Sequence, residues 1–170
     1  GMLLGIAMAL GEGLARRSPG TTAVTAAIGG LLGGLFGCLA GLAGNAVFVC
    51  YRRGGGLGIL ANTMRMHAAA LTTLSGGIGL AVGACGGSLG KATARLFAGL
   101  AAGLAAGALY PFLAAVFVPA ANPDLVIPEG AVNRLLWLGL IGVLLGLFVP
   151  AFSFRRARRR PAPPETQAAA

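Results

Sequence analysis

Residues 21–51, TTAVTAAIGGLLGGLFGCLAGLAGNAVFVCY, decide the fold of this chain. The stretch contains no charged residue and no proline. A helix needs about 20 apolar residues to cross a bilayer, and this stretch is longer. Each glycine destabilises a helix in water by about 1 kcal/mol relative to alanine. In lipid, however, every backbone group must be bonded internally, so we expect a membrane-spanning helix here.

Glycines recur along this stretch and along later apolar runs at intervals of four residues. Small residues at this spacing let a neighbouring helix approach closely. We therefore predict helix-packing faces at Gly29, Gly33, Gly37, Gly41, Gly79, Gly83, Gly87, Gly99, Gly103 and Gly107. Segments 29–44 and 76–90 resemble the glycine-zipper segments of small bacterial membrane proteins. That resemblance implies a packing device and no particular activity.

Composition places the whole chain in the membrane class. Of its 170 residues, 56% are hydrophobic and only 10% are charged, whereas soluble domains average about 25% charged residues. The net charge is +9. The basic residues stand at the ends of apolar runs, where they control topology and meet anionic lipid headgroups. We therefore expect membrane lipid, and no nucleic acid, as the partner of these charges.

The apolar runs predict an all-α, polytopic membrane helical bundle with about four spans and glycine-zipper packing. We expect a membrane domain over residues 1–154, in which residues 1–15 form a partial helix too short to span alone. Residues 57–67 are predicted to be a semi-polar connector, and Pro111 predicts a kink or break. A basic, then Pro/Ala-rich tail at 155–170 should be disordered. The spans are predicted at about 24–50, 68–90, 96–118 and 135–154.

Charge patterning predicts the orientation of the bundle. The tail carries five arginines that should be cytoplasmic and bind anionic headgroups, in what we expect to be a bacterial inner membrane. Charge does not decide whether segment 68–90 spans or is re-entrant. Its length favours spanning, and its dense glycine favours re-entry. The tail arginines are Arg155, Arg156, Arg158, Arg159 and Arg160.

Two short motifs suggest binding chemistry, and each fails a test. Residues 83–93, GACGGSLGKAT, resemble a phosphate-binding loop, but Cys85 stands where glycine is required and Ala92 where serine or threonine is required. Met64, Met66 and His67 are soft ligands that suit Cu(I), but an arginine between them repels a cation. We therefore expect no cofactor and no metal, and we expect His67 to be an interfacial residue.

The chain lacks the residues that catalysis and coupled transport require. It contains one histidine and four scattered acids, and its three cysteines form no CxxC pair. No paired carboxylates and no nucleophile motif occur, so we expect that it is not an enzyme. Proton- or ion-coupled transport usually needs an ionisable residue within a span. None of the four predicted spans contains one.

These observations favour a structural, scaffold or subunit role, in which the chain associates through its glycine-rich helix faces. The partners would be membrane lipid and either further copies of the chain or a larger membrane complex. The alternative is a passive channel or transporter component with a re-entrant 68–90 segment. A transporter should show a polar cavity, whereas a scaffold should show dry helix contacts. The rim of such a cavity would be formed by Asn45, Thr72, Thr73 and Ser75.

Overall fold

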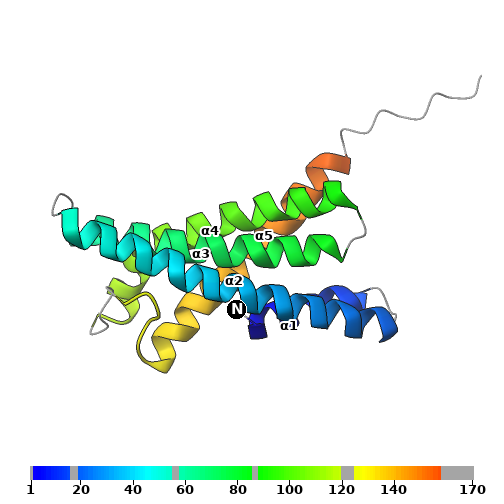
Figure 1. Cartoon of the computed structure of the whole chain (residues 1–170), viewed down its shortest axis with the longest axis horizontal. Helices are drawn as coiled ribbons and strands as arrows, with labels where there is room; N and C mark the ends of the chain where they lie inside the picture. The colour runs from blue at the N-terminus through cyan, green and yellow to red at the C-terminus, as the bar shows by residue number, and fades with distance from the viewer. Residues whose placement is uncertain (1, 16–18, 55–57, 86–87, 120–124, 158–170) are drawn as a thin grey trace, which may run out of the picture.

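A computed structural model describes residues 2–15, 19–54, 58–85, 88–119 and 125–157. The regular structure of these residues is entirely α-helical (Figure 1). The helices are α1 (Met2–Ala15), α2 (Pro19–Gly54), α3 (Ile59–Ala84), α4 (Leu89–Phe117) and α5 (Ala131–Ala157).

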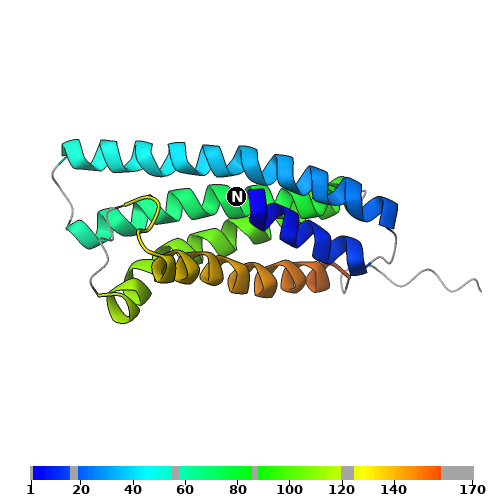
Figure 2. The ribbon, with the colours of Figure 1, turned by 90° about the horizontal axis from the view of Figure 1, so that it is seen from below.

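Helices α2 to α5 are each long and apolar enough to cross a membrane, which indicates an integral membrane protein. The 36 residues of α2 extend over about 54 Å, well beyond the ~30 Å thickness of the hydrocarbon core. The 14 residues of α1 extend over only about 21 Å. Helix α1 lies alongside the first half of α2 (Figure 2).

The second span differs from its prediction at both ends. Helix α3 begins at Ile59, so most of the predicted connector 57–67 is helical, and the helix ends at Ala84, before residue 90. The physical reason is burial. Thr63 and His67 are 3% and 0% exposed, so their polar side chains face other helices and not lipid. A polar stretch can therefore continue a membrane helix when protein surrounds it.

The third span also begins earlier than predicted, and it does not break at its proline. Helix α4 starts at Leu89 because the Ser88 hydroxyl caps it, accepting a hydrogen bond from the Lys91 backbone N–H at 3.2 Å. The helix then continues through Pro111 to Phe117. Neighbouring helices support a proline inside a membrane helix, so the missing N–H does not end it.

Helix α3 is the central element of the bundle. It contacts each of the other four helices, and 72% of its span is buried. The buried share is 39% for α4, 28% for α2 and 17% for α5. Helices α2, α3 and α4 run side by side, and α5 crosses the α3–α4 pair obliquely (Figure 1).

The apolar core lies where α3 faces α4 and α5. Leu71, Leu74, Ile78 and Val82 of α3 are at most 5% exposed. Their three- and four-residue spacing places them on one helix face. Facing core residues are Ala40 of α2, Ala102 and Ala106 of α4, and Ile141 and Leu145 of α5.

Candidate functional sites: glycine faces and a buried polar cluster

Five of the predicted packing glycines lie where the backbones of α3 and α4 touch. A methyl group on Gly99 would overlap the carbonyl oxygen of Ser75, and one on Gly103 would overlap that of Leu71. A methyl group on Gly83 would lie 2.5 Å from the Cα atom of Ala92. Such distances leave no room for any side chain, so glycine is required here. The five glycines are Gly79, Gly83, Gly99, Gly103 and Gly107.

These contacts define an antiparallel register along the length of the pair. Gly107 meets the α3 backbone at residues 67–68, Gly103 at 71–72 and Gly99 at 75–76. Gly79 in turn meets Arg95 of α4. The re-entrant alternative predicts that the chain folds back at residues 76–77 or at residues 86–87. Helix α3 is continuous across residues 76 and 77, so the chain does not fold back there, and residues 86 and 87 lie outside the described residues.

The polar rim expected for a transporter cavity is not assembled. A methyl group on Gly103 would lie 2.6 Å from the Cα atom of Thr72, so the α3 and α4 backbones touch at this level. Ser75 is fully buried in the same contact, and the Thr73 hydroxyl donates to the Ala69 carbonyl within its own helix at 2.8 Å. Asn45 is exposed on α2.

The predicted glycines of α2 divide into two groups. Gly29 and Gly33 lie under α1, because a methyl group on Gly5 would overlap the Gly29 carbonyl and approach the Gly33 Cα atom to 3.1 Å. Gly37 is half-buried. No described atom lies within 4 Å of the Cβ position of Gly41, so a contact there stays a prediction for another chain. Gly87 lies outside the described residues.

Helix α5 carries three glycines that the predicted set did not include. No described atom lies within 4 Å of the Cβ positions of Gly139, Gly142 or Gly146. Two large neighbours are also exposed, Leu135 at 70% and Val143 at 61%. The four-residue spacing of Gly142 and Gly146 is the sequence pattern that could have predicted a packing face on α5. Only the structure shows that this face is open.

A polar cluster is buried where α3, α4 and α5 meet. His67 of α3 is 0% exposed, and its ring meets the Tyr110 ring of α4 edge-on at a centroid distance of 4.5 Å. The Tyr110 hydroxyl donates a hydrogen bond of 2.8 Å to Oδ1 of Asn133 on α5. Tyr110 and Asn133 are each 1% exposed. One polar side chain from each of three helices therefore meets inside the bundle.

This cluster corrects the prediction that His67 is an interfacial residue. His67 lies inside the candidate span Leu60–Ala84 and is fully enclosed. The error arose because the predicted span began at residue 68. The soft ligands predicted to suit Cu(I) do not form one site either. Met64 and Met66 are about 200° apart around one helix and do not face a common point.

Two further polar atoms near the start of α5 are buried. Nδ2 of Asn133 and Nε1 of Trp137, one helical turn apart, are N–H donors without a described acceptor. Helices α3 and α5 begin at this end of the bundle, and α4 ends there. The loop before α5 is held close to the helix, because Nε of Arg134 donates to the Pro128 carbonyl at 2.9 Å and Pro128 is buried.

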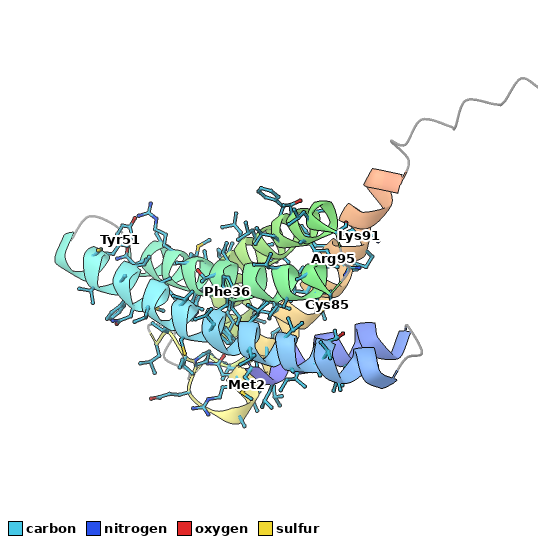
Figure 3. The ribbon with its side chains drawn as sticks, turned by 45° about the vertical axis from the view of Figure 1, so that its right-hand side comes forward. Met2, Phe36, Tyr51, Cys85, Lys91 and Arg95 are labelled. Atoms are coloured by element: carbon cyan, nitrogen blue, oxygen red, sulfur yellow. The ribbon has the colours of Figure 1, made fainter. Side chains whose placement is uncertain are left out.

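Basic side chains lie at the opposite end of the bundle. Lys91 and Arg95 are found there together with Cys85, far from Tyr51 (Figure 3). Nη1 of Arg95 donates to the Val82 carbonyl at 2.7 Å and so binds the last turn of α3. Arg155 and Arg156 lie on the last turn of α5, and Arg158, Arg159 and Arg160 lie outside the described residues. The headgroup prediction therefore stays a prediction.

Comparison with known proteins adds no analogy to this geometry. No protein-family model matches the chain, and no curated protein or solved structure is significantly similar to it.

Proposed function

We propose that this chain is a structural or subunit-type membrane protein that associates with other chains through a glycine-bearing face of α5. The observation that carries this proposal is the open face around Gly139, Gly142 and Gly146. Nothing within the described residues contacts their Cβ positions. The helix that carries them is apolar and long enough to span, so this face is open within the membrane.

The contrast with α3 and α4 supports this role. There the spaced glycines bring two backbones into contact, which we interpret as glycine-zipper packing within one chain. Lipid tails are as apolar as leucine, so helices associate in membranes through close packing and not through the hydrophobic effect. An open glycine face leaves accessible backbone that a second helix can cover in the same way.

The proposed partner on this face is a second copy of the chain. All copies insert with the same orientation, so two α5 helices can meet around a two-fold axis normal to the membrane. We further propose a bacterial inner membrane with the C-terminus in the cytoplasm, where the arginines of residues 155–160 bind anionic headgroups. This role requires no cofactor and no reaction.

Association can be tested by FRET between labelled full-length chains at increasing density in lipid vesicles. We expect the parent chain to associate, and Gly142→Leu to lower the association constant at least tenfold because a side chain fills the face. Gly11→Leu is the matched control on α1, because Gly11 is exposed, has an open Cβ position and is outside the predicted packing set, and it should associate like the parent. A parent that stays monomeric at high density, or a Gly142→Leu variant with parental affinity, would reject the α5 face.

Orientation can be tested with single cysteines and an impermeant thiol reagent, in a background without the three native cysteines. Cysteines at Gly58 and Ile127 should be labelled from the outside, because both positions are exposed at the same end of the bundle. A cysteine at Ser88, exposed at the other end, should be protected until the membrane is permeabilised. The reverse pattern would place the tail outside.

A channel or transporter component is the second candidate, and one observation favours it. An ionisable side chain inside a span is usually functional, and His67 is such a side chain. The version with a re-entrant 68–90 segment has less support, because α3 is continuous from Ile59 to Ala84.

A further inference from the structure

Helix α2 carries a line of exposed residues on one of its faces. Six residues follow one another at alternating intervals of four and three, and all six are exposed, with Leu31 at 77% and Leu42 at 66%. This heptad spacing places them in a single seam along the helix. We call this line the α2 seam. It consists of Leu31, Leu35, Cys38, Leu42, Asn45 and Val49.

The α2 seam lies opposite the side of α2 that packs on α3. Phe36 occupies the space beside Gly77 of α3, and a methyl group on Gly44 would lie 3.2 Å from the Cβ atom of Ala70. Helical periodicity places this contact side about 180° from the seam. Helix α2 also lies along one edge of the bundle, so the seam faces outward (Figure 2).

Asn45 gives the seam a polar group at the depth of the hydrocarbon. Its neighbour Gly44 faces α3 between Met66 and Ala70. This contact places Asn45 only about 8 Å along the bundle from the middle of the candidate span Leu60–Ala84. The hydrocarbon core extends about 15 Å on either side of its own middle. The exposed amide therefore lies among lipid tails, which offer it no hydrogen bond, and such an environment is unfavourable for a polar group.

A second copy of the chain is the partner that fits this amide. An asparagine side chain both donates and accepts hydrogen bonds, so two identical side chains can bond to each other. All copies insert with the same orientation, so the Asn45 side chains of two copies lie at the same depth around a two-fold axis normal to the membrane. Parallel helices with heptad seams pack in this way, and a single asparagine in the seam fixes their register.

We propose that the α2 seam is a second association face, on which Asn45 hydrogen-bonds to Asn45 of a second copy. Interhelical hydrogen bonds of this kind stabilise helix association in membranes. This face is additional to the glycine-bearing face of α5. Two-fold contacts on two different helices connect copies into a row, because two parallel two-fold axes together generate a translation. A chain that uses both faces therefore forms assemblies larger than a pair.

The native cysteines test the seam by disulfide crosslinking of full-length chains in phosphatidylcholine vesicles. Cys50→Ala/Cys85→Ala leaves Cys38 on the seam, whereas Cys38→Ala/Cys85→Ala leaves Cys50, about 100° away around the helix. Both cysteines are exposed. Iodine enters the bilayer and oxidises two adjacent thiols to a disulfide. We expect dimers to form severalfold faster through Cys38, because a disulfide requires close Cα atoms. Equal rates, or no dimer through Cys38, would overturn the proposal.

The hydrogen bond is tested in the chain that retains only Cys38. Asn45→Leu keeps the seam apolar and removes the amide, so the crosslinking rate should fall severalfold. Asn45→Gln retains an amide and should recover most of the parental rate. Leucine is favourable in a membrane helix, so misfolding does not explain a slower rate in Asn45→Leu. A parental rate in that variant would reject the hydrogen bond.

The α2 seam and the α5 face can fail separately. Gly142→Leu, which fills the α5 face, should leave crosslinking through Cys38 intact, because the two faces lie on different helices. Asn45→Leu changes no residue of the α5 face. If Gly142→Leu also abolished crosslinking through Cys38, the chain would have one interface, and the α2 seam would be rejected as a second one.

Discussion

Helices α3 and α5 show opposite relations between apolarity and burial. Helix α3 is the least apolar of the four candidate spans and is 72% buried, whereas α5 is the most apolar and is 17% buried. A soluble protein would show the reverse trend, because its apolar residues avoid water. In a membrane the lipid-facing helix must be apolar, and the enclosed helix can carry polar residues. Low apolarity in a span therefore indicates the centre of the bundle.

Glycine has different surroundings in the same two regions. In the α3–α4 pair, glycines remove side chains where two backbones touch, so they are needed for the fold itself. On α5 the glycines face away from the described chain, so a side chain can be added there without a clash. The following predictions separate the two uses, because each compares one substitution in both environments.

The largest difference is expected between Gly103→Leu and Gly139→Leu. Leucine at residue 103 would overlap the α3 backbone, which cannot retreat as a side chain can, so we expect a loss of about 3 kcal/mol or more. Leucine at residue 139 meets open space and should change the free energy of unfolding by less than about 0.5 kcal/mol. Reversible unfolding in mixed micelles, at a dilution where chains are monomeric, measures both.

Equal stability of these two variants would contradict the assignment of the α3–α4 contact. Gly103→Ala provides an intermediate control, since even one methyl group would meet the Leu71 carbonyl. We expect Gly103→Ala to lie between the parent and Gly103→Leu.

A smaller difference is expected within α5, between Leu145→Ala and Leu147→Ala. Leu145 is 0% exposed in the core, so its truncation leaves a cavity and should cost about 3 kcal/mol. Leu147 is 62% exposed to lipid, which fills the space that alanine leaves, so a cost below about 1 kcal/mol is expected. The same unfolding assay applies. A larger loss for Leu147→Ala would place the wrong face of α5 against the core.

The smallest effect is expected at the start of α4. Ser88→Ala removes the hydroxyl that accepts from the Lys91 N–H and should cost about 1 kcal/mol. Ser88→Asp restores a hydrogen-bond acceptor at this position and should recover the parental free energy of unfolding. Such recovery would show that the loss in Ser88→Ala comes from the missing helix cap. If both variants unfold like the parent, Ser88 does not determine where α4 begins.

Much of this architecture follows from local sequence patterns. The uncharged run at residues 21–51 predicts α2, and residues 1–15 predict a helix too short to span, as α1 is. The four-residue glycine spacing predicts close contacts, and those at Gly99 and Gly103 exist. These features were accessible because chain length, charge and helix periodicity are properties of a single segment.

Which face of each helix is covered, by contrast, is decided by the tertiary structure. The spacing of Gly142 and Gly146 resembles that of Gly99 and Gly103, yet only the latter pair lies against a backbone. His67 stands 43 residues from Tyr110, and no local pattern relates them (67 to 110).

By itself, the sequence determined that this chain forms membrane helices, because the need to bond every backbone group in lipid acts on each segment separately. Only the tertiary structure decided that α3 begins at Ile59, that His67 is enclosed and that α5 leaves its glycines open. The physical reason is that a polar or small side chain in a span is tolerated in more than one surrounding. The neighbour of such a side chain can be another helix or lipid. Which of the two it is depends on how segments that are distant in the chain pack together.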